Sequence, residues 1–125
     1  MNQIILKNSR KNYLKKPNKL KLAYITGATK GIGRSTAITF ANAGWDLILL
    51  SRDLEMMEIL RNELSETQSK INLVKCDLSN ENEIEKSVKE SIKKYGCPSV
   101  LINNAGSAFN GNLICLLYTS DAADE

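Results

Sequence analysis

The sequence predicts an α/β domain with a doubly wound parallel sheet, and specifically the N-terminal half of such a sheet. The first observation is that short apolar runs alternate with longer segments whose apolar residues recur every three or four positions. The second is that the connections between these segments are short, which is typical of parallel strands joined by right-handed helical crossovers. For four strands connected in this way we expect the spatial order 3-2-1-4, with helices on both faces of the sheet.

Four apolar runs are the predicted strands. They span residues 22–25, 46–50, 71–74 and 100–102. The second run reads Asp-Leu-Ile-Leu-Leu, and its continuous apolar stretch is typical of a strand covered on both faces, as in parallel sheets. In the order 3-2-1-4 the fourth strand has no neighbour on its outer side. We therefore expect an unpaired edge there, which favours aggregation and poor folding.

The first predicted helix begins near Gly31 and ends at about Ala43, just before Gly44. A glycine that follows the last apolar position is a common helix stop. We expect one face of this helix to carry Ile32, Thr36 and Phe40.

Two further helices follow the second and third strands, and each begins with a side chain able to accept a hydrogen bond from a backbone N–H. Asp53 is the predicted cap of the earlier helix. Ser79 or Asn80 begins the later one, where Asn80-x-x-Glu83 resembles a capping box. The apolar positions after Asp53 are Leu54, Met57, Leu60 and Leu64. Those after Asn80 are Ile84, Val88 and Ile92.

Length and composition exclude several classes of protein. The 125 residues suffice for one domain, and 42% apolar with 25% charged residues is ordinary globular usage. No apolar run approaches the roughly 18–20 residues of a membrane span, so we expect no membrane segment. The absence of histidine excludes a Ser-His-Asp triad, a Cys-His pair and a histidine-ligated zinc from this chain. Cys76, Cys97 and Cys115 form no C-x-x-C motif, so we predict no metal site and reduced thiols in a cytoplasmic protein.

The net charge of +3 is unevenly distributed. Residues 1–21 hold seven basic residues and no acid, whereas the rest of the chain holds ten basic and fourteen acidic residues. We interpret residues 1–20 as a disordered basic extension, and a contact of this extension with nucleic acid or anionic lipid is the alternative. Tyr13 is its one aromatic residue, whereas interleaved aromatic residues are typical of single-strand binding, so we predict no nucleic-acid partner.

A glycine-rich turn joins the first strand to the first helix. It reads Thr-Gly-Ala-Thr-Lys-Gly-Ile-Gly over residues 26–33, with the spacing G-x-x-x-G-x-G. Gly27 permits a tight turn out of the strand, Gly31 lets a pyrophosphate approach the backbone, and Gly33 lets the helix pack closely on the sheet. The helix N-terminus then offers free N–H groups and the positive end of its dipole to a diphosphate. This turn predicts a dinucleotide-binding site.

The end of the second strand indicates which dinucleotide binds. An acid at this place would accept hydrogen bonds from the 2′-hydroxyl of NAD and repel a 2′-phosphate. The sequence has Ser51 and Arg52 there instead, a hydroxyl and a guanidinium that both suit phosphate, and Lys30 adds a second positive charge. We assign Asp53, the acid that follows, to the cap of the next helix rather than to the ribose of the cofactor. We therefore predict NADP rather than NAD, and the alternative is that Arg52 is a solvated surface residue.

Three segments together resemble a known family. The turn at residues 26–33, the triplet Cys-Asp-Leu at 76–78 and the sequence Asn-Asn-Ala-Gly at 103–106 each follow a predicted strand. In this order they resemble successive signatures of the short-chain dehydrogenase/reductase superfamily, in its branch with a single-domain Rossmann fold. The resemblance covers residues 21–114.

The resemblance implies where the cofactor makes contact. Asp77 and Leu78 would lie at the adenine, where the Asp77 carboxylate accepts from the exocyclic amine. Asn104 would lie by the ribose on the nicotinamide side. For Asp77 the alternative is a turn residue, and for the Asn-Asn pair it is a tie between the fourth strand and its surroundings, which is compatible with a cofactor contact. The full set of expected cofactor-binding residues is Gly27, Ala28, Thr29, Lys30, Gly31, Ile32, Gly33, Ser51, Arg52, Asp77, Leu78, Asn104, Ala105 and Gly106.

The resemblance also implies an oxidoreductase chemistry that this chain does not complete. In the motif Y-x-x-x-K of the family, the tyrosine donates a proton and the lysine lowers its pKa, while a serine stabilises charge on the substrate oxygen. No tyrosine of this sequence has a lysine four residues later, so we predict no catalytic residue and no turnover here. For the full-length form we expect NADPH-linked redox of a small carbonyl or alcohol substrate and a homo-oligomer. The alternative function is a nucleotide-binding module without chemistry.

Residues 115–125 depart from the family pattern. They read Cys-Leu-Leu-Tyr-Thr-Ser-Asp-Ala-Ala-Asp-Glu and resemble the translation of a sequencing adapter. We therefore divide the chain into the extension 1–20, the dinucleotide-binding half-domain 21–114 and a tail 115–125 of artefactual origin. Ordinary coding sequence at this place in independent genomic reads would contradict the last assignment.

Overall fold

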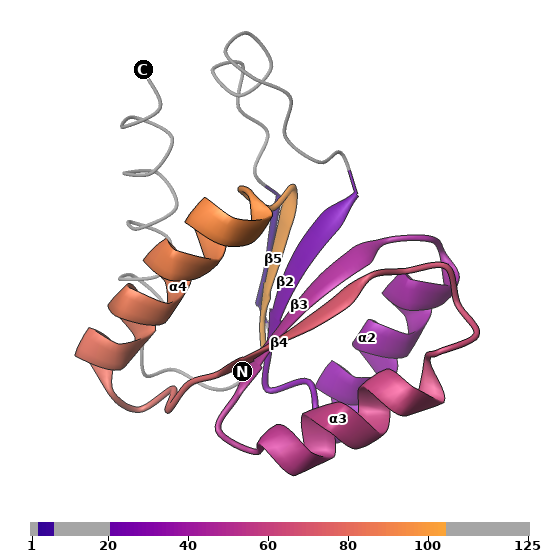
Figure 1. Cartoon of the computed structure of the whole chain (residues 1–125), viewed down its shortest axis with the longest axis horizontal. Helices are drawn as coiled ribbons and strands as arrows, with labels where there is room; N and C mark the ends of the chain where they lie inside the picture. The colour runs from indigo at the N-terminus through magenta and orange to yellow at the C-terminus, as the bar shows by residue number, and fades with distance from the viewer. Residues whose placement is uncertain (1–2, 7–20, 105–125) are drawn as a thin grey trace, which may run out of the picture.

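Strands and helices alternate along the chain and form one five-stranded sheet with helices on both faces (Figure 1). The computed structural model describes residues 3–6 and 21–104. The strands are β1 (Gln3–Leu6), β2 (Leu22–Thr26), β3 (Asp46–Ser51), β4 (Ile71–Lys75) and β5 (Val100–Asn103). The helices are α2 (Gly31–Asn42), α3 (Leu54–Glu63) and α4 (Glu81–Tyr95). Each predicted strand is present and extends one residue further at its carboxyl end.

The parallel part of the sheet confirms the predicted strand order. Across the sheet the parallel strands follow the order β4-β3-β2-β5, which is 3-2-1-4 of the predicted strands. Every residue of β2 is buried, as is every residue of β3 after Asp46. These two central strands are the continuously apolar runs, because both of their faces are covered. The carboxyl ends of all four strands meet at one edge of the sheet.

The outer edge of β5 is paired, which corrects one prediction. Strand β1 lies antiparallel to β5, with Ile4 opposite Ile102 and Ile5 opposite Leu101. The expectation of a bare edge beside the fourth strand is therefore wrong. Within the predicted extension 1–20, residues 3–6 are part of the sheet, and residues 7–20 lie outside the described residues. A short apolar run with two isoleucines has a high β-propensity, and the unpaired backbone groups of an edge strand can accept it.

Two apolar clusters lie on opposite faces of the sheet. Helices α2 and α3 cover one face, where Ala37 and Met57 pack with Leu49. Helix α4 covers the other face, where Val88 packs with Ile48. The central strands thus supply alternate side chains to the two clusters, which confirms the doubly wound arrangement. No helix within residues 3–6 and 21–104 is long and apolar enough to cross a membrane.

The inward face of α2 differs from the predicted one. Its buried residues are Gly33, Ala37 and Ala41. Ile32 is instead 63% exposed, so the predicted face is rotated by about one residue, and of its members Phe40 packs against the cluster. Small residues let this helix lie close to the sheet, and a face made of glycine and alanine carries no strong hydrophobic signal in the sequence.

Helix α3 begins as the sequence predicts. The Asp53 carboxylate accepts a hydrogen bond from the backbone N–H of Met56 at 3.1 Å, which confirms the predicted cap. Of the four predicted apolar positions Leu54 is 39% exposed, because it lies in the first turn at the end of the sheet. The other three are buried: Met57, Leu60 and Leu64.

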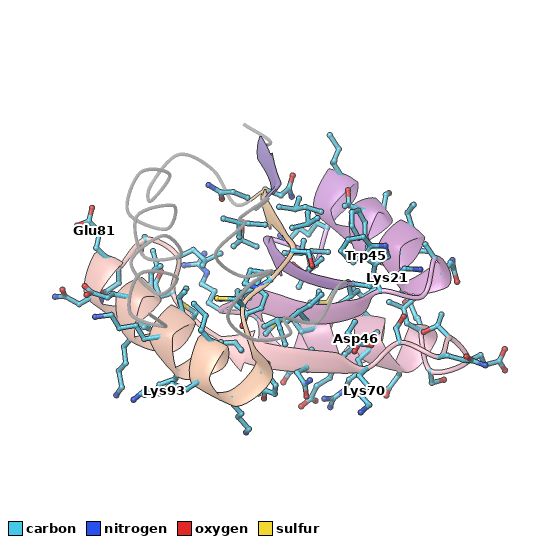
Figure 2. The ribbon with its side chains drawn as sticks, turned by 90° about the horizontal axis from the view of Figure 1, so that it is seen from above. Lys21, Trp45, Asp46, Lys70, Glu81 and Lys93 are labelled. Atoms are coloured by element: carbon cyan, nitrogen blue, oxygen red, sulfur yellow. The ribbon has the colours of Figure 1, made fainter. Side chains whose placement is uncertain are left out.

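Helix α4 is capped by Asn80, whose side-chain oxygen accepts from the N–H of Glu83 at 3.1 Å. The predicted capping box is only half formed, because the Glu83 carboxylate accepts from the N–H of Asp77 at 3.1 Å. Figure 2 shows Glu81 and Lys93 towards opposite ends of this helix. Acids in the first turn and lysines in the last turn oppose the helix dipole at both ends.

Candidate cofactor-binding site

The glycine-rich turn follows the carboxyl end of β2, in the interior of the sheet. Gly27 and Gly31 have φ angles of 64° and 55°, in the left-handed region that glycine adopts without strain. The N–H of Gly27 donates to the carbonyl of Leu50 at 3.1 Å, which anchors the turn on β3. A Cβ added at Gly31 would contact nothing within 4 Å, so the fold alone requires glycine there only through its φ angle.

Gly33 lies directly against this turn. An added Cβ would be 2.2 Å from the carbonyl oxygen of Gly27 and 2.4 Å from the Nδ2 atom of Asn104. Both distances are far below any tolerated contact of a methyl carbon. The absence of a side chain therefore lets the first turn of α2 lie on the end of β2, which is the structural role predicted for this glycine.

The N-terminus of α2 differs from those of the other helices in the described part of the chain. Its N-cap residue, Lys30, makes no side-chain hydrogen bond to the helix, and the first turn holds no acid. Asp53 and Asn80, by contrast, cap α3 and α4 with side-chain oxygens. At α2 the leading N–H groups and the positive end of the dipole are therefore not used by a capping side chain, and they suit an anion.

The Asn-Asn pair ties β5 to the glycine turn. The Thr26 hydroxyl donates to the side-chain oxygen of Asn103 at 3.0 Å and accepts from the N–H of Asn104 at 3.0 Å. The Nδ2 atom of Asn104 donates to the carbonyl of Gly27 at 3.0 Å. The structural role that the sequence left as an alternative is thus present. Thr26, which the sequence placed in the motif without a function, is the central member of this network.

The residues after Gly27 differ in how they face the site. Ala28 is fully buried and Thr29 is 8% exposed, so neither side chain extends into solvent beside the turn. The Lys30 side chain is exposed, as is that of Ile32. An exposed isoleucine at the start of α2 provides an apolar surface beside the glycine turn.

The end of β3 brings a second group of predicted residues to the same edge of the sheet. Ser51 is buried, and its hydroxyl accepts from the N–H of Asp53 at 3.1 Å. Arg52 is exposed and lines a hollow of about 540 Å³ with Asp53, Leu54, Glu55 and Lys75. The sequence reasoning missed Lys75. The signal that identifies it is its position at the end of a parallel strand, since such ends share one edge of the sheet.

Asp77 follows the end of β4. The Ser79 hydroxyl donates to its carboxylate at 2.7 Å, and the Ser79 N–H donates at 3.0 Å. These two bonds, with a smaller contribution from the Arg52 charge, hold the pKa of Asp77 below its usual value. The carboxylate is therefore a hydrogen-bond acceptor across the ordinary pH range. Asp77 also has the turn role that the sequence left open, and Leu78 packs against the cluster beneath α4.

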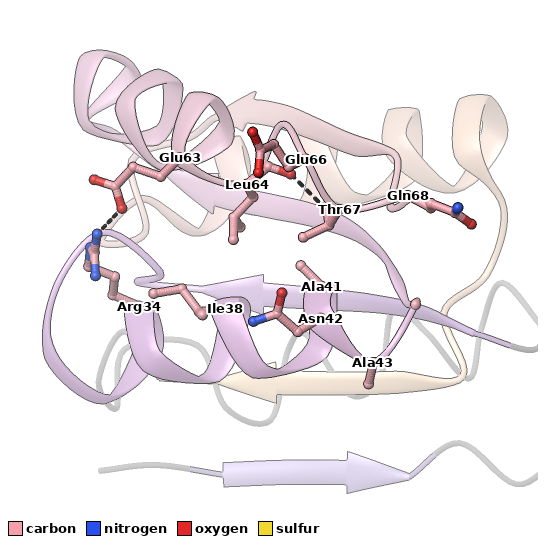
Figure 3. A pocket seen from close by; sticks show the side chains of 11 residues that line it. Arg34, Ile38, Ala41, Asn42, Ala43, Glu63, Leu64, Glu66, Thr67 and Gln68 are labelled. Carbon is pink, nitrogen blue, oxygen red and sulfur yellow. Dashed lines mark hydrogen bonds and ion pairs between the residues drawn. The ribbon is translucent and has the colours of Figure 1, made fainter.

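A separate hollow of about 800 Å³ lies between α2 and the segment after α3 (Figure 3). The ion pair between Arg34 and Glu63 bridges one end of it, and Ile38 and Leu64 contribute apolar side chains. None of the predicted cofactor-binding residues lines this hollow. Ala105 and Gly106, the last two predicted site residues, lie outside the described residues. Within residues 3–6 and 21–104 no group of three or more His, Cys, Asp or Glu side chains is arranged to hold a metal ion.

The fold and the residues at the carboxyl ends of the parallel strands define a class of protein. This class comprises doubly wound α/β domains with a glycine-rich turn between the first parallel strand and the helix that follows it. A family profile described as short chain dehydrogenase matches residues 21–119. The chain belongs to the short-chain dehydrogenase family.

Individual relatives agree with this assignment. The farnesol dehydrogenase of Aedes aegypti is 40% identical over 87 residues, which are 69% of this chain and 36% of that protein. A metagenomic short-chain oxidoreductase in complex with NADP superposes with a TM-score of 0.64 at 28% identity, over 73% of this chain and 41% of that one. An alcohol dehydrogenase from the archaeon Thermococcus sibiricus, complexed with 5-hydroxy-NADP, gives a TM-score of 0.59 at 30% identity, over 62% and 34% of the two chains. The chain spans about a third of the length of the curated relatives it matches.

Proposed function

We propose that this chain is the cofactor-binding part of an NADP-dependent short-chain oxidoreductase that interconverts a small carbonyl compound and an alcohol. The observation that carries the proposal is the glycine turn packed under an α2 N-terminus that no side chain caps. The donor set of this turn fits a dinucleotide. Backbone N–H groups at the start of α2 would bind the diphosphate, and the Asp77 carboxylate would accept from the adenine amine.

The preference for NADP rests on the end of β3. Arg52 is exposed there, and in the described part of the chain its guanidinium makes no ion pair; its charge acts on the Asp77 carboxylate only as a minor contribution. The acid that follows, Asp53, is committed to the cap of α3. A guanidinium at this place would bind a 2′-phosphate with two parallel hydrogen bonds. Two of the structural relatives described above were solved with NADP or its hydroxylated derivative, which supports the same preference.

The bound cofactor would supply the hydride for the redox step. This chain's own residues would bind and orient it: Asn104 holds the glycine turn in place through the Gly27 carbonyl, and Ile32 offers an apolar contact. The sequence contains no Y-x-x-x-K motif, so we expect no turnover from these 125 residues alone. We also propose that the full-length protein acts on a small carbonyl or alcohol substrate, forms a homo-oligomer and is cytoplasmic. The location is supported by Cys76, a buried cysteine that forms no disulfide.

The experiment compares NADPH and NADH binding to the chain and to Arg52→Gln. We expect wild-type protein to bind NADPH more tightly, and the substitution to weaken NADPH binding by about 1–3 kcal/mol, as for a hydrogen bond to a charged group. NADH binding should change little, because it lacks the 2′-phosphate. Isothermal titration calorimetry measures both dissociation constants directly.

Arg61→Gln is the matched control, since Arg61 is an exposed arginine in the last turn of α3, the helix that follows Arg52. It should leave both dissociation constants unchanged. Equal losses of NADPH and NADH affinity in Arg52→Gln would show that this arginine does not bind the phosphate, and would overturn the preference for NADP.

The second candidate is a nucleotide-binding module without chemistry, because the glycine turn by itself accounts for nucleotide binding and not for a reaction. Recovery of the coding sequence that follows distinguishes the two. A serine and a Y-x-x-x-K motif there, with carbonyl-dependent NADPH oxidation by the longer protein, would support the oxidoreductase. A longer protein that binds NADPH without any turnover over a panel of carbonyl compounds would support the module.

A further inference from the structure

Lys75 occupies a position at the cofactor edge that the family motifs do not include. It is the last residue of β4 and lies opposite Ser51 in the parallel register. The next residue, Cys76, donates its N–H to the Ser51 carbonyl at 2.9 Å, so the two strand ends are held together. Lys75 therefore stands beside the β3 end from which Arg52 projects.

The alternation of side chains along β4 decides which way Lys75 faces. Ile71 and Leu73 pack on the cluster beneath α2 and α3, whereas Val74 and Cys76 belong to the cluster beneath α4. By the two-residue period of a strand, Lys75 lies on the same face as Ile71 and Leu73. That is the face on which α3 begins, immediately after Arg52.

Arg52 and Lys75 accordingly line one hollow of about 540 Å³. Both side chains are exposed, and neither takes part in an ion pair within residues 3–6 and 21–104. The hollow also contains two acids. The Asp53 carboxylate is bound to the Met56 N–H, and Glu55 lies in the first turn of α3, where a negative charge stabilises the helix dipole.

We propose that Lys75 is a specificity-determining residue of this site, which binds the 2′-phosphate of the adenine ribose together with Arg52. This inference rests on the proposed function, because it places the adenosine end of NADP between the ends of β3 and β4. Two cations from adjacent strands neutralise a phosphate dianion better than one, and the flexible ammonium of lysine adjusts its position to a phosphate already held by arginine. The preference for the phosphorylated nucleotide is thus shared between a β3 residue and a β4 residue.

The test uses the whole chain and two fragments of the cofactor, adenosine 2′,5′-bisphosphate and 5′-AMP. Their affinity ratio isolates the 2′-phosphate from every other contact. We expect Lys75→Gln to lower this ratio by about three- to fivefold, in the range of an exposed ion pair, and Arg52→Gln to lower it more. Lys75→Arg should restore the ratio, and added salt should narrow the difference between wild-type and Lys75→Gln protein.

Lys93→Gln is the charge-matched control, because Lys93 is exposed in the last turn of α4 (Figure 2) and does not line the hollow of Arg52 and Lys75. It should leave the ratio unchanged. A ratio that falls in Arg52→Gln but stays at the wild-type value in Lys75→Gln would overturn the role of Lys75 and leave the proposed function intact. A ratio near unity in the wild-type chain would overturn both, since no residue would then recognise the phosphate.

Discussion

Replacing Gly33 by alanine probes the close contact on which the glycine turn depends. The methyl group would lie 2.2 Å from the Gly27 carbonyl oxygen and 2.4 Å from Asn104 Nδ2. A carbon and a carbonyl oxygen approach no closer than about 3.3 Å in ordinary contacts, so the helix and the turn must separate by about 1 Å. The added methyl group would contact both atoms of the hydrogen bond from Asn104 to the Gly27 carbonyl, 3.0 Å long in the native fold, so this bond is lost unless the helix alone moves.

The expected magnitude follows from three contributions. Forcing a methyl group into a packed contact costs about 1–3 kcal/mol, and the lost hydrogen bond adds about 0.5–1.5 kcal/mol. Alanine is a better helix former than glycine by up to about 1 kcal/mol, which offsets part of this loss. We therefore expect Gly33→Ala to lower the free energy of unfolding by about 0.5–4.5 kcal/mol. For a domain of this size a loss of about 2 kcal/mol lowers Tm by about 10 °C.

Urea denaturation followed by the fluorescence of Trp45, the single tryptophan of the chain, measures this change. Trp45 packs edge-on against Phe40 with ring centroids 5.1 Å apart, so its emission reports on the α2 side of the sheet. Ser35→Ala, an exposed substitution in the same helix, is the control and should stay within about 0.5 kcal/mol of wild type. A Gly33→Ala chain as stable as wild type would refute the close contact between α2 and the turn.

Three further changes test other parts of the edge. Thr26→Val removes the hydroxyl that joins Asn103 to the turn and should cost about 1–3 kcal/mol in urea denaturation, because the two hydrogen bonds of this buried hydroxyl are lost; a neutral result would contradict the network. Proline at both Ile4 and Ile5 should detach β1 from β5, lower stability and increase aggregation measured by light scattering, and unchanged behaviour would show that β1 does not protect this edge. The hydrogen bonds from Ser79 lower the pKa of Asp77 in the folded state below its value in the unfolded chain. The ionised Asp77 therefore stabilises the folded state fully above the unfolded-state pKa, and this stabilisation is lost as the pH falls through the folded-state pKa. Denaturation curves of wild type and Asp77→Asn should therefore differ at about pH 6 and converge towards about pH 2, and a constant difference would contradict this coupling.

The sequence predicted those parts of the fold that depend on local patterns. The buried strands β2 and β3 are continuous apolar runs, and the start of α3 is marked by Asp53, an acid placed to cap it. The glycine turn was predictable because each position requires glycine for a local reason. Gly27 has a positive φ angle, and Gly33 lies too close to the turn to carry a side chain. In these cases the residue type and its immediate neighbours contain the needed information.

Features that depend on distant partners were not predictable from local patterns. Strand β1 forms because the free edge of β5, nearly a hundred residues later in the chain, accepts it. The half-formed capping box at α4 arises because Glu83 accepts instead from the N–H of Asp77, which the fold places next to it. The inward face of α2 consists of small residues whose burial is dictated by the closeness of the sheet, and Ile32 is left outside for the same reason.

The role of Lys75 was missed for a related reason. It lies in no motif, and only the register between β3 and β4 places it beside Arg52. Thr26 was recognised as part of the motif, but its two hydrogen bonds reach residues on β5 and just beyond it. A strand order of 3-2-1-4 does imply that these strand ends are neighbours, so a search of strand ends for basic and hydroxyl residues is the rule that would have found both.

The central claim is that the glycine turn at the start of α2 binds the diphosphate of NADPH, and amide chemical shifts test it most directly. The chain of 13.9 kDa is small enough for two-dimensional nitrogen–proton spectra with and without NADPH. The account predicts the largest shifts at the amides of residues 27–33, with further shifts at Arg52 and Asp77. Unchanged amides at 27–33, with the largest shifts instead at Asn42 and Gln68 in the hollow between α2 and the segment after α3, would contradict it.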